Sequence, residues 1–175
     1  MPPGGARIRR EEARGVKPPE FENRIRNPAE LARWLGTLPR PLVFTNGVFD
    51  ILHRGHVTYL ARARALGAAL LVALNGDASV RRLGKSGDRP LNPLADRLAV
   101  VAALEAVAAV TWFDEDTPEA LIDACRPEVL VKGGDWPVER IAGGAGVLAR
   151  GGRVLSIAFE HERSTTDLLR RIRGG

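Results

Sequence analysis

The chain of 175 residues has the length of one domain, and 45% hydrophobic with 27% charged residues is an ordinary globular balance. Its apolar runs fall far short of the ~20 residues that a membrane span needs, and the N-terminal stretch lacks the apolar segment of a secretory signal. A net charge of +5 favours phosphate-bearing ligands or nucleic acid, but only 5% of the residues are aromatic, so no surface for stacking bases is evident. The single cysteine, Cys125, excludes a disulfide framework and favours a cytoplasmic location.

The first part of the chain is rich in Pro, Gly and Arg and shows no periodicity, so we expect a flexible basic N-terminal arm over 1–26 and one domain over 27–175. A short helix over 27–38 opens the domain, with Asn27 as its N-cap and Pro28 in its first turn. Strand and helix patterns then alternate. We expect strands over 42–47, 69–76, 109–113, 128–134 and 153–159, and helices over 56–67, 96–107, 117–125, 139–149 and 164–172.

This alternation predicts a single Rossmann-like, doubly wound α/β domain, in which helices cover both faces of a five-stranded parallel sheet. Two details of the helices are specific expectations. The helix over 56–67 is predicted to turn Val57, Leu60 and Leu66 to one side. The helix over 117–125 is predicted to be capped by Thr117.

Ligands of such sheets bind beyond the carboxyl ends of the strands. The segments after four of the five predicted strands carry glycines, imidazoles, cations and hydroxyls. Glycines let the backbone approach a ligand closely, helix starts favour anions, and Lys and Arg favour phosphate. We therefore expect a polyphosphate site at this edge, among Asn46, Gly47, His53, His56, Asn75, Asp77, Lys132, Gly134, Asp135, His161, Arg163, Ser164, Thr165 and Thr166.

His53 and His56 stand three residues apart where the first strand gives way to a helix, with Gly55 between them. Taken alone, the pair is equally compatible with a surface turn that caps a helix. A metal site needs at least a third ligand, and Asp50 or His161 would have to meet the pair by chance of the fold. We therefore favour phosphate binding and expect no protein-held metal.

Two further motifs are rejected. The tripeptide Gly84–Ser86 resembles the end of a P-loop, but that motif needs a glycine where Ser79 stands. Gly144, Gly146 and Ala149 match the dinucleotide-binding fingerprint, but that fingerprint must follow a strand, and none is predicted before them.

The stretch TNGVFDILHRGHVTYLARARALG resembles the first motif of the cytidylyltransferase-like nucleotidyltransferases, whose hallmark is His-x-Gly-His, and RSTTDLLRRI resembles their second motif. Three further stretches, NGDASVRRLGKSGDRPLNPLADRLAVVAALEAV, FDEDTPEALI and LVKGGDW, together resemble the heptose 1-phosphate adenylyltransferases of lipopolysaccharide core synthesis. The resemblance covers roughly 42–172. In this family the adenylyltransferase is often fused behind a sugar kinase, and the chain resembles the stand-alone form.

The resemblance implies residue roles. His53 and His56 would donate hydrogen bonds to the triphosphate, and Lys85 would serve as a catalytic cation on a loop. The nucleotide would also contact Thr45, Asn46, Gly47, Phe49, Arg89, Lys132, Gly134, Ser164, Thr165 and Thr166. The sugar phosphate would contact Asp77, Arg97, Asp135 and Arg163. The residues alone leave other roles open: Lys85 and Arg89 as solvated loop charges, Arg97 as a helix-surface residue, and Asp77 and 164–166 as helix caps.

The implied reaction converts ATP and D-glycero-D-manno-heptose 1-phosphate into ADP-heptose and pyrophosphate, with Mg²⁺ bound mainly through phosphate and water. The family also implies a homodimer, while no membrane or nucleic-acid partner is expected. Two alternatives remain open at this point. The same fold could transfer CMP to a polyol phosphate or AMP to another acceptor, or the chain could be a basic nucleic-acid-binding module that uses the arginines of its two ends.

Overall fold

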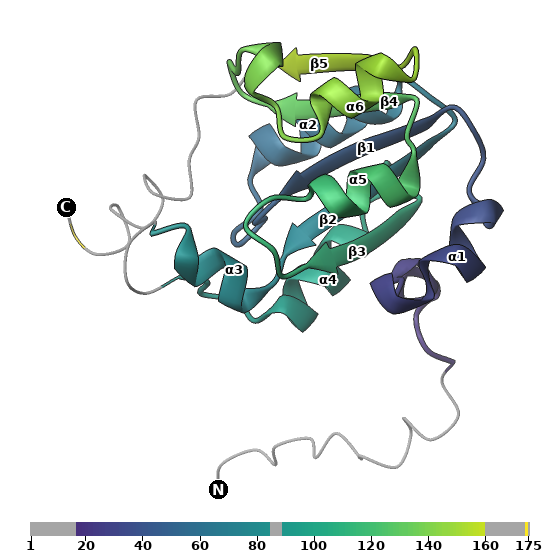
Figure 1. Cartoon of the computed structure of the whole chain (residues 1–175). Helices are drawn as coiled ribbons and strands as arrows, with labels where there is room; N and C mark the ends of the chain where they lie inside the picture. Colours follow the sequence, from purple (N-terminus) through teal and green to yellow (C-terminus); the bar gives the residue numbers. More distant parts are fainter. Residues whose placement is uncertain (1–16, 85–88, 160–173, 175) are drawn as a thin grey trace, which may run out of the picture.

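The computed structural model of the protein describes residues 17–84, 89–159 and 174, and its strands form one parallel sheet (Figure 1). The strand order is β3-β2-β1-β4-β5. The chain therefore moves outward from β1 to β3 and then crosses to β4, so the order reverses between β1 and β4. The expected α/β fold with five parallel strands is confirmed. The strands are β1 (Leu42–Gly47), β2 (Ala69–Asn75), β3 (Ala109–Phe113), β4 (Val129–Gly133) and β5 (Arg153–Ile157).

Helices cover both faces of the sheet (Figure 1). α2 (Arg54–Arg64) and α4 (Leu94–Ala102) pack on one face, while α5 (Glu119–Cys125) and α6 (Gly144–Ala149) pack on the other. α1 (Leu31–Trp34) contributes its buried indole to the second face. The short 3₁₀ segments are η1 (Glu20–Arg24), η2 (Pro28–Glu30), η3 (Leu35–Thr37) and η4 (Val138–Arg140).

The core consists of two apolar layers that the sheet separates. All seven residues of β2 are buried, with Leu70, Val72 and Leu74 in the layer under α2 and α4. Ala69, Leu71 and Ala73 point into the opposite layer, under α5 and α6. A continuous apolar run of this kind is typical of a central parallel strand, because both of its faces are covered.

Part of the predicted arm belongs to the domain. Phe21 and Ile25 pack against the layer of α2 and α4, and Ile25 forms an isolated β-bridge with Val110 of β3. Arg24 Nη1 donates to three carbonyl oxygens at 3.1–3.3 Å, that of Ala102 at the end of α4 and those of Leu104 and Val107 after it. The sequence missed this contact because two apolar residues among charged ones form no periodic pattern. Residues 1–16 of the predicted arm lie outside the described residues.

The buried side of α2 agrees with the prediction in part. Leu60 is fully buried and the following Leu66 packs against the core, as predicted, whereas Val57 is 45% exposed. Gly55, Tyr59 and Ala63 are also buried, because residues four apart share one side of a helix. The prediction weighed aliphatic residues only and so missed this row.

Three other helix predictions have mixed outcomes. Asn27 does cap the first helical segment, since its Oδ1 accepts the Ala29 N–H at 3.0 Å. Thr117 does not cap α5, which begins after Pro118 without a side-chain cap. An additional helix, α3 (Asp77–Arg82), follows β2, where no helix bounds were predicted. The helix predicted over 164–172 lies outside the described residues.

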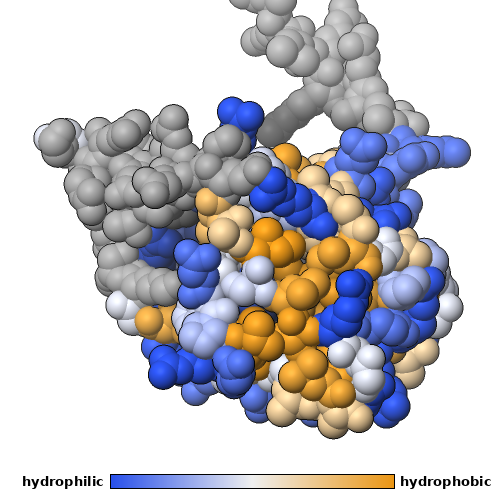
Figure 2. Space-filling model, turned by 90° about the horizontal axis from the view of Figure 1, so that it is seen from above, coloured by the Kyte–Doolittle hydropathy of each residue, from blue (hydrophilic) through white to orange (hydrophobic). Residues whose placement is uncertain are grey.

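Among the described residues, no helix has the length and apolar character needed to cross a membrane. Figure 2 views the molecule from above Figure 1 and therefore looks onto the side of β5, whose outer edge has no neighbouring strand within the described sheet. Apolar side chains gather in the middle of this side, with charged side chains around them.

Candidate active site

The strand β1 brings Asn46 and Gly47 to the carboxyl edge of the sheet, beside the point where the strand order reverses. Phe49 follows in a left-handed conformation with φ of +48° and is buried. A Cβ at position 47 would stand 2.9 Å from Phe49 Cε2. Gly47 therefore leaves room for the Phe49 ring to lie against the end of the strand. Such a backbone conformation is uncommon for a bulky residue and marks a constrained loop.

Thr45 was predicted to line the nucleotide, but its side chain is fully buried. Its hydroxyl lies 2.6 Å from the Tyr59 hydroxyl. Burial raises the pKa of Tyr59 above its ordinary value, so the phenol stays neutral in this hydrogen bond. The pair joins β1 to α2 from inside, so the Thr45 side chain is not open to a ligand in this structure.

His53 and His56 lie together at the start of α2, where their rings stack with centroids 3.8 Å apart. His53 is the N-cap residue, yet its side chain makes no capping hydrogen bond. The simple role of a helix cap therefore does not account for it. His56 also meets Phe49 edge-on at 5.3 Å and Phe159 at 6.2 Å between ring centroids. Aromatic rings on two sides fix the orientation of this imidazole.

Burial lowers the pKa of His56 from 6.5 to about 4, and the nearby charge of His53 adds to this effect. The ring is therefore uncharged near neutral pH. Its Nδ1 is buried and has no hydrogen-bond partner among the described residues. A neutral imidazole carries one N–H donor and one acceptor, so His56 can donate a hydrogen bond to a ligand without adding a full charge.

Lys132 links the ends of the neighbouring strands β4 and β1, because its Nζ donates a hydrogen bond to Asn46 Oδ1 at 3.4 Å. Both residues border a cavity of about 340 Å³ at the carboxyl ends of the strands. Its lining is Asn46, Gly47, Val48, Asn75, Leu83, Asp116, Thr117, Pro118, Lys132, Trp136, Arg140, Ile141 and Ala142. Open α/β sheets bind their ligands at such a reversal of strand order.

Several residues of this cavity were not among the predicted site residues. Asp116 and Thr117 follow the third strand, whose end carries no glycine, histidine or lysine and was therefore not predicted to bind a ligand. Trp136 and Arg140 come from the segment after β4. Asn75 was expected at the polyphosphate edge, but without a specific role. The position of Asp116 and Thr117 just after a strand is the signal that could have identified them.

Arg97 and Asp77 meet each other, but in the interior. Arg97 Nη2 donates to Asp77 Oδ1 at 2.7 Å, and its Nη1 and Nε donate to the carbonyl oxygens of Val48 at 2.7 Å and Asn92 at 3.0 Å. The Arg97 side chain has no exposed surface, whereas that of Asp77 is 31% exposed. Arg97 is therefore not the surface residue that the sequence allowed, and its guanidinium is not open to a sugar phosphate in this structure. It ties α4 to α3 and to the loop after β1.

Asp50 strengthens the same junction. Its carboxylate oxygens accept the backbone N–H groups of Leu91 at 3.0 Å and Asn92 at 2.9 Å, and Asn92 Nδ2 donates to the Asp50 carbonyl at 2.6 Å. This buried carboxylate is thus part of the scaffold. Arg89, a predicted nucleotide contact, lies two residues before Leu91, whose backbone N–H is bonded to Asp50.

Gly134 and Asp135 follow β4 but do not line the cavity. Gly134 has a φ of +101°, its N–H donates to the Ile157 carbonyl at 2.9 Å, and its own carbonyl accepts the Ser156 hydroxyl. Asp135 is exposed. The remaining predicted site residues lie outside the described residues, and their roles stay predictions: Lys85, His161, Arg163, Ser164, Thr165 and Thr166.

Within the described ranges, no group of three or more His, Cys, Asp and Glu side chains could hold a metal ion. The described part of the site is rich in hydrogen-bond donors. Uncharged imidazole, an ammonium group, amides and strand-end backbone groups converge on one edge, which suits an anionic ligand with several oxygens.

Comparison with known proteins agrees with this chemistry. A family model described as cytidylyltransferase-like matches residues 44–171. A D-beta-D-heptose 1-phosphate adenylyltransferase of Bordetella bronchiseptica is 59% identical over 157 residues, which cover 89% of this chain and 97% of that protein. The bifunctional protein HldE of Shigella dysenteriae is 48% identical over 170 residues, which cover 90% of this chain but 35% of that protein. The chain therefore spans about a third of the length of this bifunctional relative.

Solved structures place the fold in the same group. The lipopolysaccharide core biosynthesis protein of Thermoplasma volcanium superposes with a TM-score of 0.57 at 26% identity, over 70% of this chain and 98% of that chain. Pantothenate synthetase of Thermus thermophilus gives a TM-score of 0.55 at 15% identity, over 77% and 61% of the two chains, which is a likeness of fold alone. Because the family match spans most of the chain and includes the histidine pair and the strand ends around it, the chain belongs to the cytidylyltransferase-like family and is a nucleotidyltransferase.

Proposed function

We propose that the protein transfers AMP from ATP to D-glycero-D-manno-heptose 1-phosphate, giving pyrophosphate and ADP-heptose, a precursor of the lipopolysaccharide core. The Bordetella relative, matched over nearly its full length, is named for D-beta-D-heptose 1-phosphate, which supports this acceptor and its β anomer. The observation that carries the transfer chemistry is the stacked pair of His53 and His56 beside the reversal of strand order.

In the proposed reaction, an oxygen of the sugar phosphate attacks the α-phosphorus of ATP in line. The new O–P bond forms as the bond to pyrophosphate breaks. Such a step depends on positioning and on neutralising charge more than on covalent chemistry. Negative charge grows on the leaving pyrophosphate, so donors that are already fixed in place act most strongly in the transition state.

The roles divide by charge. His56 is uncharged near neutral pH in the free protein and would donate a hydrogen bond to the triphosphate, with His53 beside it. Lys132 would supply the fixed positive charge, at a place where its hydrogen bond to Asn46 already orients it. Mg²⁺ would enter with ATP and be held through phosphate oxygens and water.

The cavity of about 340 Å³ suits the heptose ring, since binding sites for small ligands begin at roughly 300 Å³. A sugar with many hydroxyl groups needs both donors and acceptors, and the side chains of Asn75, Asp116 and Thr117 offer both kinds. Trp136, which is 50% exposed, adds an apolar ring at the rim against which a sugar face can pack.

A cytidylyltransferase acting on a polyol phosphate is the competing function within this family. A pyrophosphate-release assay with ATP or CTP, each with heptose 1-phosphate or glycerol 3-phosphate, separates the two. We expect the highest kcat/KM for ATP with heptose 1-phosphate. If CTP with glycerol 3-phosphate were best, the substrate proposal would be wrong while the family assignment would stand. His56→Ala should abolish most of the release in every pair, which ties the signal to this site.

We also propose that the protein acts as a cytoplasmic homodimer. Among the described residues no strand pairs with the outer edge of β5, and apolar side chains gather on that side (Figure 2). Both features support self-association, because an unpaired strand edge is a template for pairing. Light scattering coupled to size-exclusion chromatography would give the mass in solution, and a monomer at micromolar concentration would contradict the dimer.

A further inference from the structure

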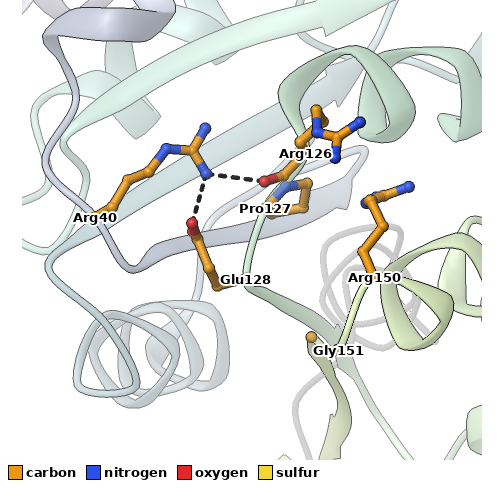
Figure 3. A pocket seen from close by; sticks show the side chains of 7 residues that line it. Arg40, Arg126, Pro127, Glu128, Arg150 and Gly151 are labelled. Atoms are coloured by element: carbon orange, nitrogen blue, oxygen red, sulfur yellow. Dashed lines mark hydrogen bonds and ion pairs between the residues drawn. The ribbon is translucent and has the colours of Figure 1, made fainter.

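A second cavity, of about 280 Å³, lies at the opposite end of the sheet, beside the starts of β4 and β5 (Figure 3). It is lined by Arg40, Arg126, Pro127, Glu128, Arg150, Gly151 and Gly152. Strands of five or six residues are roughly 17–20 Å long, so a ligand in this cavity would be remote from His53 and His56.

One of its three arginines is fully explained by the protein itself. Arg40 Nη1 donates to Glu128 Oε1 and to the Arg126 carbonyl, both at 2.8 Å, and its Nη2 donates to the Cys125 carbonyl at 3.0 Å. These carbonyls end α5. The other Glu128 oxygen accepts the Leu42 N–H at 2.7 Å. Arg40 and Glu128 therefore satisfy each other and the end of a helix.

The other two guanidinium groups are not satisfied in this way. Among the described residues, the Arg126 side chain makes no hydrogen bond or ion pair. Arg150 Nη1 donates to Asp123 at 3.1 Å, but its Nη2 is buried without a hydrogen-bond partner in the described part of the chain. Both groups lie on the same side of the cavity (Figure 3). Glu128 pairs with Arg40, and among the described residues no hydrogen bond or ion pair joins it to Arg126 or Arg150.

We infer that this cavity is a second anion site that takes a phosphate-bearing ligand, independent of the site at the carboxyl ends of the strands. The oxygens of one phosphate group can accept from two guanidinium groups at once, and Arg126 and Arg150 come from the ends of different helices to face one space. The carbonyl ends of helices repel anions, but Arg40 already occupies the last carbonyls of α5.

Calorimetric titration of the full chain with inorganic phosphate and with pyrophosphate tests the inference. A non-hydrolysable ATP analogue keeps the carboxyl-end site filled during the titration. We expect Arg126→Gln and Arg150→Gln each to weaken phosphate binding about 10-fold or more, the usual effect of losing a charge-assisted hydrogen bond. Arg33→Gln is the matched control, since it removes the same charge from a side chain that is 83% exposed on α1.

Equal weakening in all three variants would reduce the effect to overall charge and overturn the inference. Failure of the unaltered protein to bind either anion at millimolar concentration would overturn it as well. Tighter binding of pyrophosphate than of phosphate would support a ligand with two phosphate groups, and equal binding would support a single group. Arg126→Gln removes no hydrogen bond or ion pair of the described residues, so it keeps the test valid even if Arg150→Gln fails to fold.

Discussion

The two ends of the sheet handle charge in different ways. At the carboxyl end, the Arg97 side chain is completely buried and bonded to Asp77 and two carbonyl oxygens. At the amino end, the side chains of Arg40 and Glu128 are 41% and 43% exposed. A buried ion pair is costly to break, while an exposed one contributes little. The comparison indicates that the buried arginine holds the loops of the active site in place at one end. At the other end, the exposed arginine satisfies the last carbonyl groups of α5.

Loss of the buried arginine should have the largest effect. Arg97→Met removes one partner of the pair and leaves Asp77 and the Val48 carbonyl without their donor. Breaking a buried pair in this way costs about 3–5 kcal/mol in the free energy of unfolding. Urea denaturation measures this difference. A loss below about 1 kcal/mol, the range of exposed pairs, would erase the contrast between the two ends.

The histidine pair gives the next largest effect. We expect His56→Ala to lower kcat by about 10²–10³, as for the loss of one transition-state donor, while the Kd for ATP changes only a few-fold. Val57→Ala is the control, because Val57 is the next residue of α2 and is 45% exposed. Rates for His56→Ala within a few-fold of the unaltered enzyme would reduce His56 to a structural role.

His56 should also make the stability of the protein depend on pH, which tests the carboxyl end of the sheet in a second way. The pKa of His56 is about 4 in the folded protein against an ordinary value of 6.5. Between these values the unfolded chain binds more protons than the folded one, so stability is complete above pH 6.5 and falls as the pH drops toward 4. The loss is on the order of 2–3 kcal/mol. His56→Asn should remove this part of the pH dependence in denaturation curves, and an unchanged slope would contradict the buried, uncharged state of the ring.

The smallest effect belongs to the exposed pair at the amino end. Burial acts to raise the pKa of Glu128, but hydrogen bonds from Arg40 and from the Leu42 N–H outweigh it and hold that pKa below its usual range. The pair therefore stabilises above the ordinary carboxyl pKa and is lost as the pH falls through the lowered value. Arg40→Gln should cost about 0.2–1 kcal/mol at pH 7 and less at acid pH. A cost that is constant down to pH 2 would show that the bonds from Arg40 to the carbonyls at the end of α5, or its packing, are responsible and not its pairing with Glu128.

The strands and the edge that carries the site follow from local sequence. The apolar runs at β1 and β2 are buried on both faces and are recognisable without any partner. Once five parallel strands are expected, the place of His53, His56 and Lys132 at one edge follows from topology alone. This explains why the fold and this part of the site could be predicted.

The interior role of Arg97 could not be read from the sequence. Its partners Asp77 and Val48 lie 20 and 49 residues away, and nothing local marks them as partners. A pattern of apolar spacing treats every arginine on a helix as exposed, so a buried one is always missed. Phe21 and Ile25 were assigned to the arm for a related reason, since their packing depends on the surface left by α4 and β3.

Chemical modification of Cys125 can report local unfolding of the domain. It is the only thiol in the chain, and as the last residue of α5 it is completely buried against the sheet. Burial raises its pKa to about 12, so the reactive thiolate is almost absent from the native state. Alkylating reagents can therefore modify this residue only after the layer under α5 and α6 comes apart. The alkylation rate in native buffer measures how often the layer under α5 and α6 opens. A ligand that stabilises the folded state should lower this rate.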